Sequence, residues 1–102
     1  MTLGELIKAL ESLDGRRVVA KGFGAPHSDR GDYSNVAFEP ANNVTVGSMR
    51  KYAKGALGKT FTGYTGGDYR MSEYVDALIG NWGRCGEEIT SLHIEYWAGR
   101  LA

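Results

Sequence analysis

The chain has 102 residues, the length of a single domain that can fold around one core without disulfide bonds. Twelve Lys and Arg balance twelve Asp and Glu, so no overall field attracts the chain to nucleic acid or to an anionic membrane. This balance argues against a general nucleic-acid binder. Any anionic ligand must therefore be held by local groups.

The N-terminal residues lack a basic region followed by an apolar stretch, and apolar runs elsewhere are only a few residues long. The sequence therefore predicts neither a signal peptide nor a membrane span, and we expect a cytoplasmic protein. Cys85 is the single cysteine, so the chain can form no internal disulfide and no cysteine-rich metal site. A reducing compartment fits this composition.

The first predicted element is an amphipathic helix over residues 3–13. Thr2 and Glu5 have the spacing of a capping box, and leucines follow at helical spacing. The Asp-Gly pair after the last leucine ends this helix. Residues 17–21 contain a short β-branched run bounded by turn residues, which predicts the first strand.

Residues 34–39 alternate between apolar and polar side chains, which predicts a half-buried strand that Pro40 closes. Thr45 is a good N-cap for a second amphipathic helix, which Gly58 ends. Tyr52 belongs to the apolar pattern of this helix, and Lys51 and Lys54 lie towards its end, where they are favourable against its dipole. Residues 59–64 alternate threonines with aromatic residues and predict a third strand.

Residues 74–79 alternate again and predict another strand, and residues 80–86 form a turn rich in glycine. From Glu87 onward the apolar spacing fits a helix and a strand equally well, and we expect a strand or a mixed ending. The chain is therefore predicted to be one domain over residues 1–102. Its fold class is α+β, with a small, mainly antiparallel sheet and two amphipathic helices packed on one face.

The stretch from Gly22 to Tyr33 concentrates polar side chains in a segment rich in Gly and Pro, for which we expect neither a helix nor a paired strand. Arg30 has the planar donor fork that matches a phosphate. His27 and Ser28 are predicted to hydrogen-bond a phosphate or a ribose. In the alternative interpretation His27 bonds to a nearby carboxylate, and Arg30 pairs with a neighbouring aspartate.

A second Gly-rich loop covers residues 63–70. Tyr64 and Tyr69 lie in it, and with Tyr33 of the first stretch they are predicted to stack on a flat base. Arg70 is predicted to hold phosphate, beside backbone amides that the Gly pair leaves accessible. The alternatives are ordinary packing for the tyrosines and a simple hairpin turn for the Gly pair.

A metal site is a further alternative. His27, Asp29, Asp32 and Asp68 are hard ligands that could hold a divalent ion and activate water, as a phosphodiesterase requires. The chain has only two histidines, however, and His93 lies in an apolar segment where a structural role is expected. We therefore assign no metal, no cofactor and no catalytic residue from the sequence.

Residues 1–71 contain a series of short motifs. They are Pro26-His27-Ser28, Arg30-Gly31 with Tyr33, Ala37-Phe38-Glu39-Pro40, Asn43-Val44-Thr45-Val46-Gly47 with Met49, Ala56-Leu57-Gly58-Lys59-Thr60-Phe61, Gly63-Tyr64 and Gly66-Gly67. In these motifs the chain resembles a family of small, mostly uncharacterised proteins encoded by bacteriophages.

The resemblance implies a phage protein that acts in the cytoplasm of an infected bacterium. Many such proteins disable host defences, and one class, the sponges, consists of small oligomers that bind nucleotide alarm signals in aromatic and polar pockets. By this analogy we expect a non-enzymatic homo-oligomer that sequesters an immune second messenger of the cyclic oligonucleotide or cyclic ADP-ribose type. The alternatives are a phosphodiesterase that cleaves such a messenger through His27, and a protein-binding inhibitor of a host defence enzyme.

Overall fold

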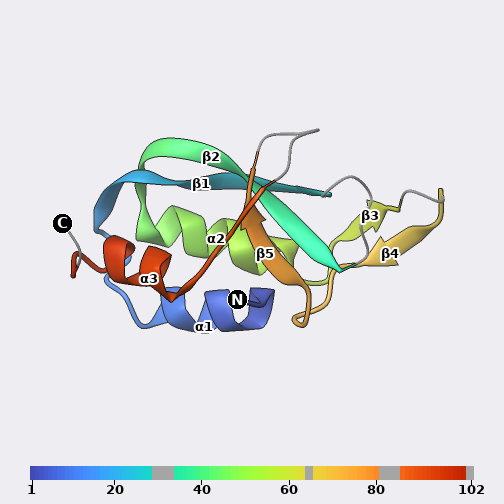
Figure 1. The fold of residues 1–102 in the computed structure, drawn as a ribbon, viewed down its shortest axis with the longest axis horizontal. Coiled ribbons are helices and arrows are strands. Elements are labelled where there is room, and N and C mark those ends of the chain that lie inside the picture. Colours follow the sequence, from blue (N-terminus) through green and yellow to red (C-terminus); the bar gives the residue numbers. More distant parts are fainter. Residues whose placement is uncertain (29–33, 64–65, 81–85, 101–102) are drawn as a thin grey trace.

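The computed structural model describes residues 1–28, 34–63, 66–80 and 86–100, which form an α+β fold. The helices are α1 (Leu3–Glu11), α2 (Val46–Ala56) and α3 (Ser91–Trp97), and the strands are β1 (Val18–Ser28), β2 (Asn35–Thr45), β3 (Thr60–Thr62), β4 (Asp68–Arg70), β5 (Asp76–Ile79) and β6 (Glu87–Glu88). The molecule measures 41 × 23 × 18 Å, and the β3–β4 hairpin forms one end of it (Figure 1). None of these helices is long and apolar enough to cross a membrane.

The main sheet has the strand order β1-β2-β5-β6. Strands β1 and β2 pair antiparallel, as do β5 and β6, whereas β2 and β5 form a parallel pair that the sequence did not predict. In Figure 1 the three helices lie on the same side of the β1–β2 ribbon. The predicted fold class is therefore confirmed, with a third helix added.

Strand β1 is much longer than predicted. The prediction that Gly22–Tyr33 is not a paired strand is wrong as far as Ser28, because β1 continues to that residue and pairs with β2. Two features make this pairing compatible with Gly and Pro. The register shifts between Phe23 and Pro26, and β1 is the edge strand of its sheet, where a residue without an N–H is tolerated.

Strand β2 likewise passes through Pro40, which was predicted to close it. Pro40 pairs with Phe23, and the strand ends only at Thr45. The parallel pairing with β5 covers only Asn35–Phe38. At Pro40 the strand therefore has a paired neighbour on one side only, and the missing N–H leaves no ladder bond broken.

Side-chain caps begin the first two helices as predicted. The Thr2 hydroxyl accepts a hydrogen bond from the Glu5 N–H at 3.2 Å, and the Glu5 carboxylate accepts one from the Thr2 N–H at 2.9 Å. The Thr45 hydroxyl accepts from the Ser48 N–H at 3.0 Å. Gly58, with φ of +79°, follows the end of α2 in the left-handed conformation that favours glycine.

The C-terminal segment is mixed, with the two-residue strand β6 followed by α3. Helix α3 begins at a cap that sequence periodicity does not reveal: the His93 ring accepts a hydrogen bond from the Thr90 N–H through Nδ1 at 3.0 Å. His93 thus has a structural role, as expected. The helix carries Trp97 into the core, where this side chain is almost completely buried.

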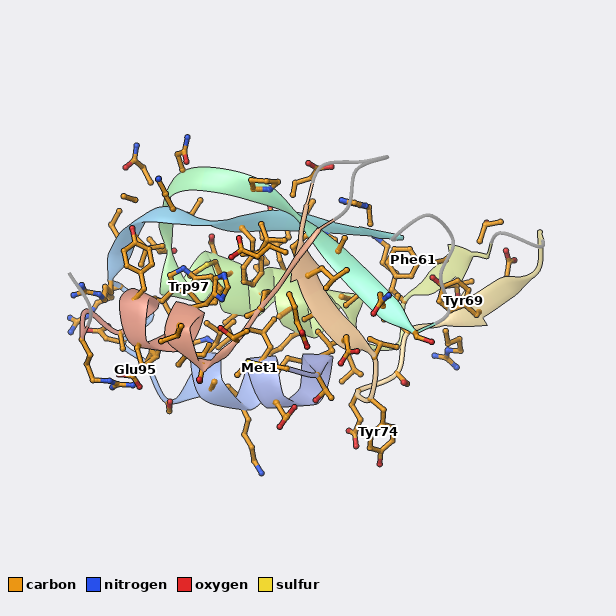
Figure 2. All side chains as sticks on the ribbon, viewed as in Figure 1. Met1, Phe61, Tyr69, Tyr74, Glu95 and Trp97 are labelled. Atoms are coloured by element: carbon orange, nitrogen blue, oxygen red, sulfur yellow. The ribbon has the colours of Figure 1, made fainter. Side chains whose placement is uncertain are left out.

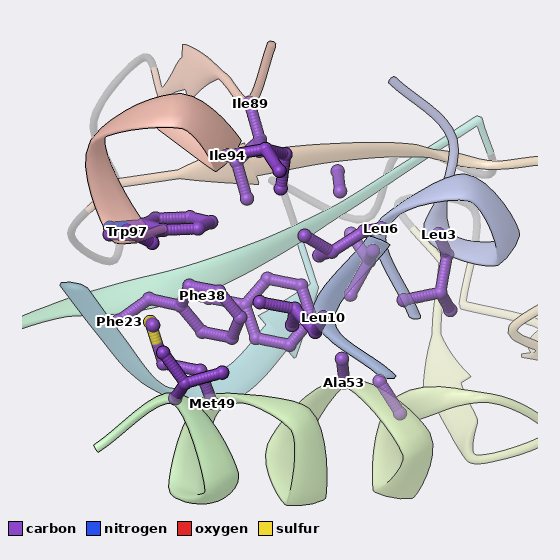
Figure 3. Close-up of a cluster of buried hydrophobic side chains, with 14 of the residues drawn as sticks. Leu3, Leu6, Leu10, Phe23, Phe38, Met49, Ala53, Ile89, Ile94 and Trp97 are labelled. Carbon is purple, nitrogen blue, oxygen red and sulfur yellow. The ribbon is translucent and has the colours of Figure 1, made fainter. Parts of the chain in front are cut away.

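The core lies between the β1–β2–β5 sheet and the helices. Figure 3 shows the rings of Phe23 and Phe38 between Met49 of α2 and Trp97 of α3. The Phe23 ring centroid is 4.5 Å from that of Phe38 and 5.5 Å from that of Trp97. Because Phe23 belongs to the Gly-rich stretch of β1, this core fixes the strand from which the predicted site residues extend.

Candidate functional site

His27 lies on β1, opposite Ala37 of β2. Its ring nitrogen Nε2 is 2.8 Å from the Gly80 carbonyl oxygen and 3.4 Å from Oε1 of Glu39. Because a carbonyl oxygen can only accept, Nε2 carries a proton and donates it. The structural alternative expected a nearby carboxylate, and Glu39 is near the ring, but the shorter contact is to a backbone carbonyl. Ligand binding by His27 remains a prediction.

Ser28, another predicted ligand residue, ends β1, where its backbone pairs with Val36. Three further predicted ligand residues lie outside the part of the chain that the structure describes. Arg30, Tyr33 and Tyr64 fall in segments 29–33 and 64–65, which are not described, and their predicted roles are unchanged.

The second Gly-rich loop is part of the β3–β4 hairpin. Its turn is closed by a hydrogen bond from the Gly63 N–H to the Gly67 carbonyl at 2.8 Å, so the hairpin alternative for the Gly pair is confirmed. Tyr69 lies opposite Phe61, with 6.3 Å between their ring centroids (Figure 2). Arg70 donates from Nε to the Gly58 carbonyl at 3.3 Å.

The two predicted regions meet at one end of the molecule, because β3 contacts β1 there (Figure 1). Beside this contact, a groove of about 500 Å³ runs between β1 and α2. We call it the basic groove. Its lining consists of Ala25 and Pro26 from β1, Ser48, Lys51, Tyr52 and Gly55 from α2, and Lys59.

The basic groove has the chemistry of an anion site. Among the described residues its lining includes two lysines and no carboxylate, and Tyr52 is 42% exposed. The ammonium group of Lys59 also lies 5.5 Å from the centroid of the Phe61 ring, so the groove borders the hairpin. An ammonium group beside an exposed aromatic ring can hold a phosphate next to a flat ring system.

Sequence reasoning missed Lys51, Tyr52 and Lys59 as site residues. It assigned Lys51 to the helix dipole and used Tyr52 only as part of the apolar pattern of the helix. The available signal was the spacing of Ser48, Lys51, Tyr52 and Gly55, which are the first, fourth, fifth and eighth residues of a helical stripe. That stripe is polar enough to indicate an exposed face that is not part of the core.

A second groove, of about 440 Å³, is lined mainly by α1. We call it the acidic groove, because its described lining includes Glu5, Glu11 and Glu73 and one cation, Lys8. Glu11 pairs with Lys54 of α2 at 2.9 Å, and this hydrogen bond lowers the pKa of the Glu11 carboxyl. The chain has zero net charge, but its described residues form one groove with more cations than carboxylates and one with more carboxylates than cations.

Within residues 1–28, 34–63, 66–80 and 86–100, no three His, Cys, Asp or Glu side chains gather as a metal site requires. Asp29 and Asp32 of the alternative metal set lie outside these ranges.

Searches of family models, curated proteins and solved structures find no match to this chain. The site is therefore interpreted from its own geometry.

Proposed function

We propose that the protein binds a small phosphorylated nucleotide in the basic groove and sequesters it without catalysis. The observation that carries this proposal is that Lys51, Lys59 and the exposed Tyr52 line one groove, with no carboxylate among the lining residues that the structure describes. In a chain of zero net charge, such local segregation gives the groove a positive potential. Its volume is within the range of small-ligand sites.

Each lining group has a distinct role in this proposal. Lys51 and Lys59 bind the phosphate groups as compact positive charges. The Tyr52 ring packs against the base, and the Ser48 hydroxyl hydrogen-bonds a phosphate or a sugar. Pro26 supplies the apolar wall on the β1 side.

The phage context adds the biological role. If the chain belongs to the phage family that it resembles, a nucleotide held in this groove fits an immune second messenger of the cyclic oligonucleotide or cyclic ADP-ribose type. Sequestration needs tight binding and slow release, which rigid, preformed elements such as α2 and β1 favour. The proposal includes assembly as a homo-oligomer and action in the host cytoplasm.

The test is calorimetric titration with a panel of AMP, ADP-ribose, cyclic di-AMP and cyclic di-GMP. Lys51→Ala and Lys59→Ala should each lower the affinity for the tightest binder about tenfold or more, because each removes a charge-assisted contact. Lys8→Ala is the matched control, since it removes the same charge from the acidic groove. Affinities unchanged by both groove substitutions, or no binding by the whole panel, would contradict the proposal.

The same mixtures separate the proposal from its alternatives. Chromatography after incubation should recover the nucleotide intact. A cleaved product would indicate the phosphodiesterase. In that case His27→Ala should also abolish turnover. Failure of the whole panel, together with a host defence enzyme retained by the protein in a pull-down, would indicate the protein-binding inhibitor.

A further inference from the structure

Gly55 is an exposed glycine in the last turn of α2. Glycine weakens a helix, because it has the most conformational freedom to lose on folding. A side chain at this position would meet no obstacle, since a Cβ built on Gly55 has no heavy atom within 4 Å. The backbone does not require glycine either, because the φ of Gly55 lies outside the left-handed range.

Two other glycines in this region have clear structural reasons. A Cβ on Gly47 would lie 2.9 Å from the Gly15 carbonyl oxygen, so this position permits the close contact between α2 and the turn that joins α1 to β1. Gly58 has a φ of +79°, which residues with a side chain rarely adopt. In the described fold, neither reason applies to Gly55.

Because Gly55 has no side chain, it leaves part of the basic groove open. Gly55 lines the basic groove, one helical turn after Lys51 and Tyr52. A side chain here would occupy open space at the lining of the groove. Glycine is suited to sites where a ligand must approach the backbone closely.

We propose that Gly55 is a specificity-determining residue, against which the flat ring of the ligand lies. The inference rests on the proposed function and assigns to Gly55 the discrimination between nucleotides, which carry a planar base, and sugar phosphates, which do not. The base would lie over the bare helix at Gly55, between Tyr52 and Pro26, with its phosphates on Lys51 and Lys59. Phosphorylated sugars without a base would contact the lysines and leave the surface at Gly55 unused.

The test is Gly55→Ala, studied by thermal unfolding and by NMR titration, which measures weak as well as tight binding. The probes are the tightest nucleotide of the panel above and ribose 5-phosphate, which has the phosphate and sugar without a planar ring. The substitution should raise the midpoint of thermal unfolding by about 2 to 6 °C. It should lower the affinity for the nucleotide at least tenfold and leave that for ribose 5-phosphate within about twofold.

Gly67→Ala is the matched control. Gly67 is an exposed glycine outside the basic groove, and a Cβ there also meets no heavy atom within 4 Å. It should leave both affinities unchanged. Nucleotide affinity that is unchanged in Gly55→Ala, or an equal loss for both probes, would overturn the inference alone. No binding of either probe to the wild-type protein would overturn the proposed function and the inference together.

Discussion

The indole N–H of Trp97 donates a hydrogen bond to the backbone carbonyl of Lys21, with 3.0 Å between nitrogen and oxygen. The bond joins α3 to β1 across most of the length of the chain. It satisfies a carbonyl of an edge strand, and the same indole packs edge to face against the Phe23 ring. Trp97 thus stabilises the strand that carries one wall of the basic groove.

Trp97→Phe should lower the free energy of unfolding by about 1 to 2 kcal/mol, because the ring is largely retained while the Lys21 carbonyl loses its partner. Trp97→Ala should cost about 3 to 5 kcal/mol, since it also leaves a cavity. Urea unfolding measures both values. Tyr96→Phe, which removes a hydroxyl from a partly exposed ring of the same helix, should change the stability by less than about 0.5 kcal/mol. Equal losses in Trp97→Phe and Tyr96→Phe would show that the Lys21 bond contributes nothing.

Stability should also fall in acid, with Glu5 as one contributor. The hydrogen bond from the Thr2 backbone lowers the pKa of Glu5 below its ordinary value of 4.5, so the unfolded chain binds more protons than the folded one. The contribution is complete above pH 4.5 and is lost as the pH falls through the lowered pKa. The pKa values of Glu11 and Glu95 are lowered by Lys54 and Arg100 and add in the same direction.

Glu5→Gln tests this contribution, because an amide can still accept the Thr2 hydrogen bond but does not titrate. Midpoints of thermal unfolding measured from pH 7 to pH 3 should fall less steeply for Glu5→Gln than for the wild-type protein. Parallel curves would mean that the capping carboxylate does not contribute to the acid sensitivity.

The sequence predicted the elements whose signals are local. The capping box of α1, the Thr45 cap of α2 and the strand at 74–79 each depend on neighbouring residues, and the structure contains all three. The long β1 and β2 strands were missed because Pro26 and Pro40 normally break strands. What permits them is tertiary: one strand is at the edge of the sheet and the other has lost its second neighbour at that point.

The site shows the same division between local and tertiary information. The Gly-rich stretch contributes to the proposed groove only Ala25 and Pro26, which form a wall and carry no charge. The charges come from Lys51 of α2 and from Lys59 just before β3, and the packing of α2 and β3 against β1 brings them to that wall. Sequence spacing alone cannot show these contacts, because the whole of β2 separates β1 from α2 and β3.

The junction between α2 and the hairpin should depend on Gly58. Its N–H donates to the Met71 carbonyl at 2.7 Å, and its carbonyl accepts from Arg70. Gly58→Ala should cost about 1 kcal/mol, because a Cβ is strained at a φ of +79°. Gly55→Ala, three residues earlier, should shift the urea midpoint in the opposite direction. Unchanged or increased stability of Gly58→Ala would contradict the assignment of Gly58 as the glycine that the backbone requires.

Substitutions of His27 can distinguish a structural role of this residue from a role in ligand binding. Its Nε2 donates to the Gly80 carbonyl, so His27→Ala should lower the free energy of unfolding by about 1 to 2 kcal/mol. His27→Gln, whose amide N–H₂ can also donate to that carbonyl, should recover part of the loss. If the nucleotide binds in the basic groove, both variants should bind the tightest nucleotide of the panel within about twofold of the wild-type affinity, because His27 does not belong to the lining of that groove. A tenfold loss of affinity in His27→Ala with unchanged unfolding would instead place His27 in the ligand site.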